Sequence, residues 1–463
     1  MPHDLPRPVP EASDTHTPDT PGARSRDLAR DLWAAAVAVA LVTTAALVGT
    51  AIERRDGTLH VGWPPLYANW GPHVGPGTPA AVLVAAAVVA YGPRLAARLP
   101  WRPLLAVAWG TAMAWTWSLA LIDGWRRGIA DRLTTRYEYL QVIDRFQDIP
   151  GTLRGFTGHI LLNSPDHWPP HVAGHPPAAT LTFVLLDRVG LGGGAWAGVF
   201  CITVGASAGA AVLVAVRALA GEALARRAAP FLVLAPAAVW MGTSADGYFT
   251  AVAAWAVAFL ALAVTGRRPR LTGCAAGLLS GLTCYLSYGL TLFAVIAAAT
   301  LLLGAGAHRL RALPYVLAGL AVVPLAFTLA GFNWWEAYRL LVDRYHQGAG
   351  GIRPYGYWVW ANLACTALLV GPATAAALRR TATNLRIPLS SPERRLAVLV
   401  AAAAVALLLA DLSGMSKAET ERIWLPFAAW LLAAGAFLTH PRAWLAAQAA
   451  LALLLNSLLL TGW

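Results

Sequence analysis

The chain has 463 residues, of which 57% are hydrophobic and 13% are charged, about half the charged share of a typical soluble protein. Its formal net charge is +12 and comes almost entirely from arginine. The arginines lie in short clusters between apolar runs, as in the cytoplasmic loops of membrane proteins, so we do not expect nucleic acid as a partner. Repeated apolar runs near the roughly 20 residues that cross a bilayer predict membrane helices, because lipid leaves no other partner for the backbone.

Two parts are expected along the chain. Residues 1–31 are rich in Pro, Thr, Asp and Arg and are predicted to form a disordered cytoplasmic tail. Residues 32–463 are predicted to form one all-α domain, a polytopic transmembrane helical bundle of about 13 spans. The spans are placed at 32–51, 79–97, 104–122, 195–216, 229–244, 248–264, 271–288, 289–305, 313–331, 356–378, 395–413, 422–439 and 443–460. Only Ser287-Tyr288-Gly289 separates two of these spans, so 271–305 is read as either one span or two.

A further apolar segment, 178–190, is too short to cross a bilayer comfortably. With the N-terminal tail inside, a crossing here would put the next two basic clusters outside, whereas a segment that does not cross leaves every later cluster inside. We therefore predict a re-entrant or juxtamembrane helix at 178–190, within an extracytoplasmic loop that covers 123–190. The polar segments 52–78, 332–355 and 412–421 then also face outward from the plasma membrane.

The longest outer segment, 123–177, carries the richest set of ionisable residues. Asp123 begins it, Glu138 stands between two tyrosines, and Asp144 follows. Three histidines then come at helical spacing, at positions 167, 171 and 175, and the segment closes with His175-Pro176-Pro177. A loop of this length inside a compact protein is usually functional. Any chemistry is therefore expected on the outer face.

These motifs resemble the glycosyltransferase C superfamily. An acidic outer loop closed by His-Pro-Pro is similar to an outer loop of those enzymes, and Ser244-Ala245-Asp246 resembles their acidic residue at the outer end of a later span. The segment Glu419–Pro426 looks like a charged-then-aromatic element of the actinobacterial branch. The resemblance implies a membrane enzyme that transfers a sugar from a polyprenyl-phosphate donor to a glycan or lipid acceptor on the outer face.

The chemistry of such a transfer can be argued separately from the resemblance. Inverting transfer from a lipid phosphate needs a carboxylate base for the acceptor hydroxyl and cations for the departing phosphate. The candidates for the catalytic carboxylate are Glu138, Asp123 and Asp144. The candidates for binding the donor phosphate are Arg422, His175 and Arg353. A divalent ion, Mg²⁺ or Mn²⁺, is a further option, with Asp246, His171 and His167 as its ligands.

Each candidate also has a purely structural interpretation. Glu138 could pair with a neighbouring arginine, Asp123 could end a helix, and Asp246 could cap one. Arg422 begins an apolar span on the outer side, where basic residues are disfavoured, so it is either an anion ligand or an interfacial side chain. Two other functions stay open: a secondary transporter or lipid flippase, which requires paired charges within the spans, and a structural protein of the cell envelope.

Overall fold

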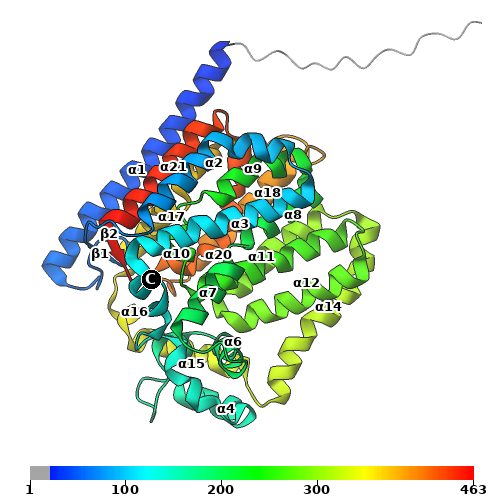
Figure 1. Ribbon diagram of the computed structural model, residues 1–463. Coiled ribbons are helices and arrows are strands. Elements are labelled where there is room, and N and C mark those ends of the chain that lie inside the picture. Colours follow the sequence, from blue (N-terminus) through cyan, green and yellow to red (C-terminus); the bar gives the residue numbers. More distant parts are fainter. Residues whose placement is uncertain (1–20, 463) are drawn as a thin grey trace, which may run out of the picture.

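The computed structural model describes residues 21–462, and helices account for almost all of its regular structure (Figure 1). Residues 1–20 of the predicted tail lie outside the described residues. Within the described part, eight helical stretches are long and apolar enough to cross a membrane. They are Ser25–Asp56, Thr78–Arg98, Trp101–Asp123, Gly194–Ala220, Ala245–Val264, Gly306–Leu329, Tyr355–Asn384 and Pro392–Leu412. The all-α bundle and a multi-pass membrane protein are thereby confirmed.

The helices of the bundle and the shorter elements have the following bounds. The bundle contains α1 (Pro21–Asp56), α2 (Thr78–Arg98), α3 (Trp101–Ala120), α7 (Gly194–Gly205), α8 (Ala208–Ala220), α9 (Glu222–Val233), α11 (Ala245–Val264), α12 (Pro269–Leu286), α13 (Phe293–Leu303), α14 (Gly306–Leu329), α17 (Tyr355–Asn384), α18 (Pro392–Leu412), α20 (Leu425–Leu431) and α21 (Pro441–Leu458). The shorter elements are β1 (Ala68–Trp70), η1 (Leu121–Asp123), η2 (Arg126–Ala130), η3 (Arg132–Thr134), η4 (Tyr139–Phe146), α4 (Ile149–Gly155), η5 (Phe156–His159), α5 (Pro170–Gly174), α6 (Ala178–Arg188), α10 (Ala238–Met241), η6 (Tyr288–Leu292), α15 (Trp334–Gln347), α16 (Ala349–Ile352), α19 (Thr420–Ile423), η7 (Leu432–Phe437) and β2 (Leu459–Thr461).

Every predicted span coincides with one to three helical elements, so several spans are broken. The span expected at 229–244 divides into α9 and α10, and Pro236, which has no backbone N–H to donate, lies between them. A second break occurs within α17, where Gly371 adopts a positive φ of 77° directly before Pro372. The segment 271–305 forms α12, η6 and α13 in succession. The turn at Ser287 therefore separates two helical segments.

The first helix begins earlier than the predicted boundary at residue 32. Helix α1 begins at Pro21, and Asp31 is completely buried against α17. Its two carboxylate oxygens pair with Arg379 at 2.7 Å and Arg380 at 2.6 Å. Two guanidinium groups offset the cost of burying this carboxylate, which explains how a charged residue of the expected tail joins the folded structure.

Small residues allow the helices to pack closely. A Cβ atom on Gly277 of α12 would lie 2.0 Å from the carbonyl oxygen of Val316 on α14. In return, a Cβ on Gly319 of α14 would lie 2.3 Å from the carbonyl oxygen of Cys274. Close backbone approach through glycine is a common means of helix association in membranes. Helix α11, which is buried along most of its length, packs between α8 and α12 in the centre of the bundle.

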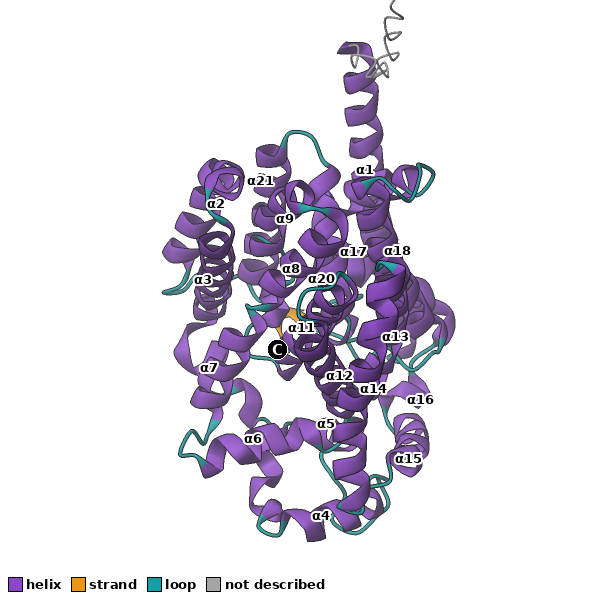
Figure 2. Ribbon diagram, turned by 90° about the vertical axis from the view of Figure 1, so that its right-hand side faces the viewer, coloured by secondary structure: helices purple, strands orange, loops and turns teal. Residues whose placement is uncertain are grey.

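The short elements of 123–190 gather at one end of the molecule. Figure 2 shows α4, α5 and α6 below the long helices, together with α15 and α16 from the outer segment 332–355. Helix α6 has 11 residues, about half the length of a spanning helix. It packs against η4. This end of the molecule is called the loop end below.

A two-stranded sheet, which the sequence did not indicate, ties the chain's last residues to its first loop. Strand β1 pairs antiparallel with β2, with Ala68 opposite Thr461 and Trp70 opposite Leu459. The amide of Gly462 donates a further hydrogen bond of 3.3 Å to the carbonyl oxygen of Tyr67. The sheet places Gly462 beside the polar side chains described next.

Candidate active site

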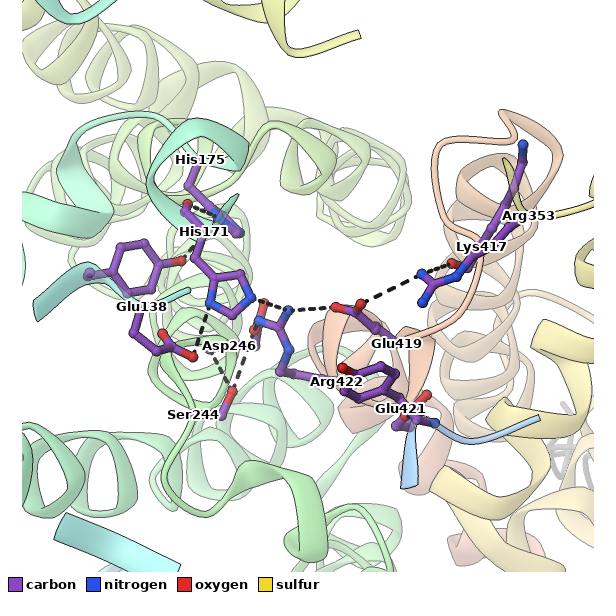
Figure 3. A network of polar contacts seen from close by, with 12 residues as sticks. Glu138, His171, His175, Ser244, Asp246, Arg353, Lys417, Glu419, Glu421 and Arg422 are labelled. Atoms are coloured by element: carbon purple, nitrogen blue, oxygen red, sulfur yellow. Dashed lines mark hydrogen bonds and ion pairs between the residues drawn. The ribbon is translucent and has the colours of Figure 1, made fainter. Parts of the chain in front are cut away.

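A network of buried polar side chains joins four distant segments at the loop end (Figure 3). Glu138 precedes η4, His171 lies on α5, Asp246 lies in the first turn of α11, and Arg422 lies on α19. All four side chains are buried. Buried charges are retained in proteins when they are paired, so the four residues form one electrostatic unit. Residues from each of the three groups of candidates are thereby brought together.

Arg422 occupies the centre of this network. Its Nη1 forms an ion pair with Oδ2 of Asp246. Its Nη2 lies 3.4 Å from Oε2 of Glu419 and 3.3 Å from Nε2 of His171. The planar fork of a guanidinium can contact several partners at fixed angles, which a lysine cannot do. Arg422 is therefore held in one orientation by groups on three different segments.

His171 connects Arg422 to Glu138. A guanidinium group only donates hydrogen bonds, so Nε2 of His171 is the acceptor and the ring proton lies on Nδ1. Nδ1 lies 3.0 Å from Oε1 of Glu138. The backbone reinforces the pair, because the amide of His171 donates to the carbonyl oxygen of Tyr137 at 3.1 Å. The imidazole is thus oriented from both sides.

Glu138 is a carboxylate in this environment. Burial alone raises its pKa, but the contact with His171 and the charge of Arg422 outweigh burial, and the pKa falls below its usual value. The side chain is therefore ionised at neutral pH, although it is buried. A deprotonated carboxylate in a polar pocket meets the first requirement of a general base.

Asp246 is aligned by the N-terminus of α11. Ser244 is the N-cap of this helix, and its hydroxyl oxygen accepts a hydrogen bond of 3.2 Å from the amide of Asp246. The same hydroxyl donates to Oδ2 of Asp246 at 3.5 Å. A carboxylate in the first turn is stabilised by the positive end of the helix dipole. The helix cap is thus Ser244 and not Asp246, which lies in the first turn of α11 and forms the ion pair with Arg422.

His175 forms a hydrogen bond with the backbone of His171. Its Nδ1 lies 2.8 Å from the carbonyl oxygen of His171 and 3.0 Å from the hydroxyl of Tyr139. Because a carbonyl oxygen only accepts, the proton of His175 lies on Nδ1. Burial lowers the pKa of His175 to about 4, so the ring is neutral at physiological pH. A neutral ring with an engaged Nδ1 fits a positioning role better than the phosphate contact expected from the sequence.

Glu419 extends the network toward Arg353. Ala418 and Glu419 both have positive φ, at 70° and 61°, a conformation that costs a non-glycine residue on the order of 1 to 3 kcal/mol. This turn directs the Glu419 carboxylate between Arg422 and Arg353, 3.7 Å from Nη1 of the latter. Arg353 also donates to the carbonyl oxygens of Leu59, at 2.9 Å, and Lys417, at 2.8 Å. Arg353, which was predicted to bind the donor phosphate, thus stabilises the turn that carries Glu419.

Asp123, the second predicted base, lies in a neighbouring cluster of cations. Its carboxylate is 2.9 Å from Nε2 of His73, 3.0 Å from Nη2 of Arg132 and 3.4 Å from Nε of Arg127. These contacts match a structural role for Asp123 at the end of α3. Arg132 also donates to the carbonyl oxygen of Thr461 at 3.0 Å, and so ties β2 to this cluster.

A narrow cavity separates the two clusters. It is lined by Arg132, Leu133, Glu138, Thr243, Ser244, Ala245, Arg422 and Gly462. Its volume of about 10 Å³ leaves room for roughly one water molecule. A ligand larger than water therefore enters only if the loop segments around the cavity move apart. Asp144 and His167 do not line this cavity, and both are exposed.

The structure does not bring the predicted metal ligands Asp246, His171 and His167 together into one group. No three His, Cys, Asp or Glu side chains within residues 21–462 form a group that could hold a metal ion. Arg422 lies against both Asp246 and His171, so its guanidinium takes up the ligand atoms that a cation would need. His167 is on the exposed turn before Trp168. These residues do not fit a resident divalent ion.

Sequence reasoning missed Glu421, the neighbour of Arg422. Its side chain is completely buried, and Oε1 accepts a hydrogen bond of 2.9 Å from the amide of Tyr67, beside β1. Burial raises the pKa of Glu421 to about 7. Glu419, Arg132 and His73 were missed as well. The signal that could have found Glu419 and Glu421 is their place beside Arg422, in a charged segment between two apolar runs.

No family model and no curated protein matches the sequence. The structure resembles the crystal structure of the Archaeoglobus fulgidus oligosaccharyltransferase in complex with Zn and sulfate, with a TM-score of 0.50 and 16% identity over 77% of this chain. The apo form of that enzyme matches with a TM-score of 0.48 and 13% identity over 73% of the chain. The chain spans about half of the enzyme, 53% and 50% of its length. At this identity the likeness shows the fold alone.

Proposed function

We propose that this protein is an inverting membrane glycosyltransferase of the actinobacterial type, which transfers a hexose or pentose from a polyprenyl-phosphate donor to a glycan or lipid acceptor. In this proposal it lies in the plasma membrane with its N-terminus in the cytoplasm and the loop end outside. The observation that carries the proposal is the placement of an ionised carboxylate and a buried guanidinium, Glu138 and Arg422, on the two sides of one imidazole.

The two groups match the two halves of the reaction. Glu138 takes the proton of the acceptor hydroxyl as its oxygen attacks the anomeric carbon of the donor sugar. The bond between that carbon and the phosphate oxygen breaks, and the electron pair leaves with the lipid phosphate. Arg422 stabilises the negative charge that gathers on this phosphate. Attack from the face opposite to the leaving group inverts the anomeric configuration.

The neighbours of the two groups keep them apart and oriented. Direct pairing of Glu138 with Arg422 would neutralise the base and occupy the cation. His171 lies between them, and Asp246 and Glu419 hold the guanidinium from its other sides. A site with fixed charges needs little reorganisation during the reaction, which is the main source of electrostatic catalysis.

Sugar transfer in a reconstituted system tests the proposal. Purified protein in lipid nanodiscs is given radiolabelled polyprenyl-phosphate sugars and a panel of glycan and lipid acceptors. We expect the Glu138→Gln variant to lose transfer by 100-fold or more, since general-base catalysis contributes on the order of 10²- to 10⁴-fold.

The control is Asp343→Asn, which changes an exposed carboxylate on α15 at the same end of the molecule. It is expected to retain the wild-type rate. Transfer that survives in Glu138→Gln would refute the assignment of the base. Failure of the wild-type protein to consume any donor would refute the function itself.

A further inference from the structure

A large apolar groove lies between α2, α3 and α9, outside the polar network. These three helices contact one another (Figure 1). The groove has a volume of about 650 Å³, within the range of small-molecule sites. Its floor includes Ala229, Pro230 and Val233 of α9. Its walls include Tyr91, Leu95 and Val107, exposed hydrophobic side chains. An apolar groove on a membrane helix pair takes up hydrocarbon, because lipid chains are its surrounding solvent.

The groove has one charged end. Arg94 and Arg98 both line it, both are exposed, and they lie four residues apart on the same face of α2. Within residues 21–462 neither forms an ion pair with a carboxylate, whereas the nearby Arg226 is paired with Glu222 at 2.6 Å. Two uncompensated guanidinium groups beside an apolar groove match a ligand that has a phosphate at the end of a hydrocarbon chain.

The position of the charged end separates this groove from the proposed donor site. Helix α2 runs from Thr78, where Gly77 donates to the carbonyl oxygen of Leu121 beside the Asp123 cluster, to Arg98. A helix of 21 residues is about 30 Å long, roughly the thickness of a bilayer core. A phosphate bound by Arg94 and Arg98 therefore lies on the opposite side of the membrane from one bound by Arg422.

We infer that this groove binds an anionic membrane phospholipid, with one acyl chain between α2 and α3 and the phosphate on Arg94 and Arg98. The inference does not depend on the proposed glycosyltransferase activity. One residue shows that the groove has space for a chain: a Cβ on Gly110 of α3, which lines the groove, meets no atom within 4 Å. A larger side chain at position 110 would therefore occupy the groove without shifting the surrounding protein atoms.

Native mass spectrometry tests the lipid site directly. The purified protein is exchanged into detergent with equal amounts of phosphatidylglycerol and phosphatidylcholine, and the bound lipids are counted. We expect the wild-type protein to retain phosphatidylglycerol preferentially. The double variant Arg94→Gln/Arg98→Gln should lose this preference by about tenfold or more, because each basic side chain contributes attraction to anionic lipid. The variant Gly110→Leu should retain neither lipid.

Matched variants control for general effects. Arg102→Gln removes an exposed arginine in the first turn of α3 that does not line the groove. Ala106→Leu enlarges an exposed residue of α3, one turn from Gly110 and outside the groove. Both should bind lipid as the wild type does. Size-exclusion profiles and melting temperatures establish that the variants are folded, and the arginine pair, being exposed, tests the inference even if Gly110→Leu does not fold.

Three results would overturn the inference. The first is equal retention of both lipids by the wild-type protein. The second is unchanged phosphatidylglycerol binding in the arginine double variant and in Gly110→Leu. The third is displacement of phosphatidylglycerol by an equal amount of polyprenyl phosphate, which would assign the groove to the carrier lipid instead.

Discussion

Arg422 and Asp246 form an ion pair in which each side chain is only 5% exposed. Removing one partner of such a pair leaves an uncompensated buried charge, which usually costs about 3 to 5 kcal/mol. We expect Arg422→Gln to lower the melting temperature of the purified protein markedly, and Arg422→Lys to lower it less. Adding Asp246→Asn to Arg422→Gln should recover part of the loss. If the two single changes are simply additive in thermal melts, the pair is not coupled in the way the structure indicates.

His171 should tune the base rather than act in the reaction itself. It is one of the groups that lower the pKa of Glu138. A base works only when it is deprotonated, so activity falls as the pH drops through the pKa of Glu138. His171→Gln removes the imidazole contact that favours the carboxylate, and the pKa should rise. The acidic limb of the kcat/KM profile should therefore move to higher pH. A lower kcat with an unmoved acidic limb would argue for a different base.

Chelation should leave the activity intact. Arg422 occupies the ligand atoms of Asp246 and His171, so the guanidinium supplies the positive charge that a divalent ion would otherwise provide. We expect sugar transfer in excess EDTA to proceed at the rate without chelator, and added Mg²⁺ or Mn²⁺ to have little effect. A rate that collapses in EDTA and returns with one metal would show that the substrate complex recruits an ion.

Glu421 should make the stability depend on pH. Burial raises its pKa to about 7, above the usual value of 4.5, so the folded protein holds a proton that the unfolded chain releases. Protonated Glu421 contributes its full stability below about pH 4.5, and this contribution to the free energy of unfolding is lost as the pH rises to 7. Glu421→Gln should remove this loss and stabilise the protein at pH 8 by on the order of 3 kcal/mol. Melting curves between pH 4.5 and 8 test this, with Asp343→Asn as the control for an exposed carboxylate.

The helices of this fold could be predicted from the sequence because each apolar run carries its own signal. A run that must satisfy its backbone within lipid becomes a helix wherever its neighbours lie. The breaks at Pro236 and Gly371 were less visible, because proline is tolerated in some membrane helices. Asp31 was assigned to the tail because its partners Arg379 and Arg380 are far away in the sequence.

The candidate site could be predicted only in part, for the same reason. Basic-cluster counting indicated that Glu138, His171, Asp246 and Arg422 belong to outer segments, and the structure brings these four together. The sequence could not indicate that Arg422 lies between Asp246 and His171, and for this reason a metal ion was expected at these residues. Nor could the sequence indicate the role of Arg132, because its partner Thr461 lies 329 residues further along the chain.

The pairing of β1 with β2 sets the order in which the protein can mature. Ribosomes make residues 68–70 early, yet these residues meet their partners only after 459–461 have been synthesised. Gly462, beyond that strand, lines the cavity next to Glu138 and Arg422. A nascent chain that stalls before the last helix is inserted therefore displays an unfinished pocket. A shortened product would have an unpaired strand edge at β1, a state that quality-control proteases can recognise.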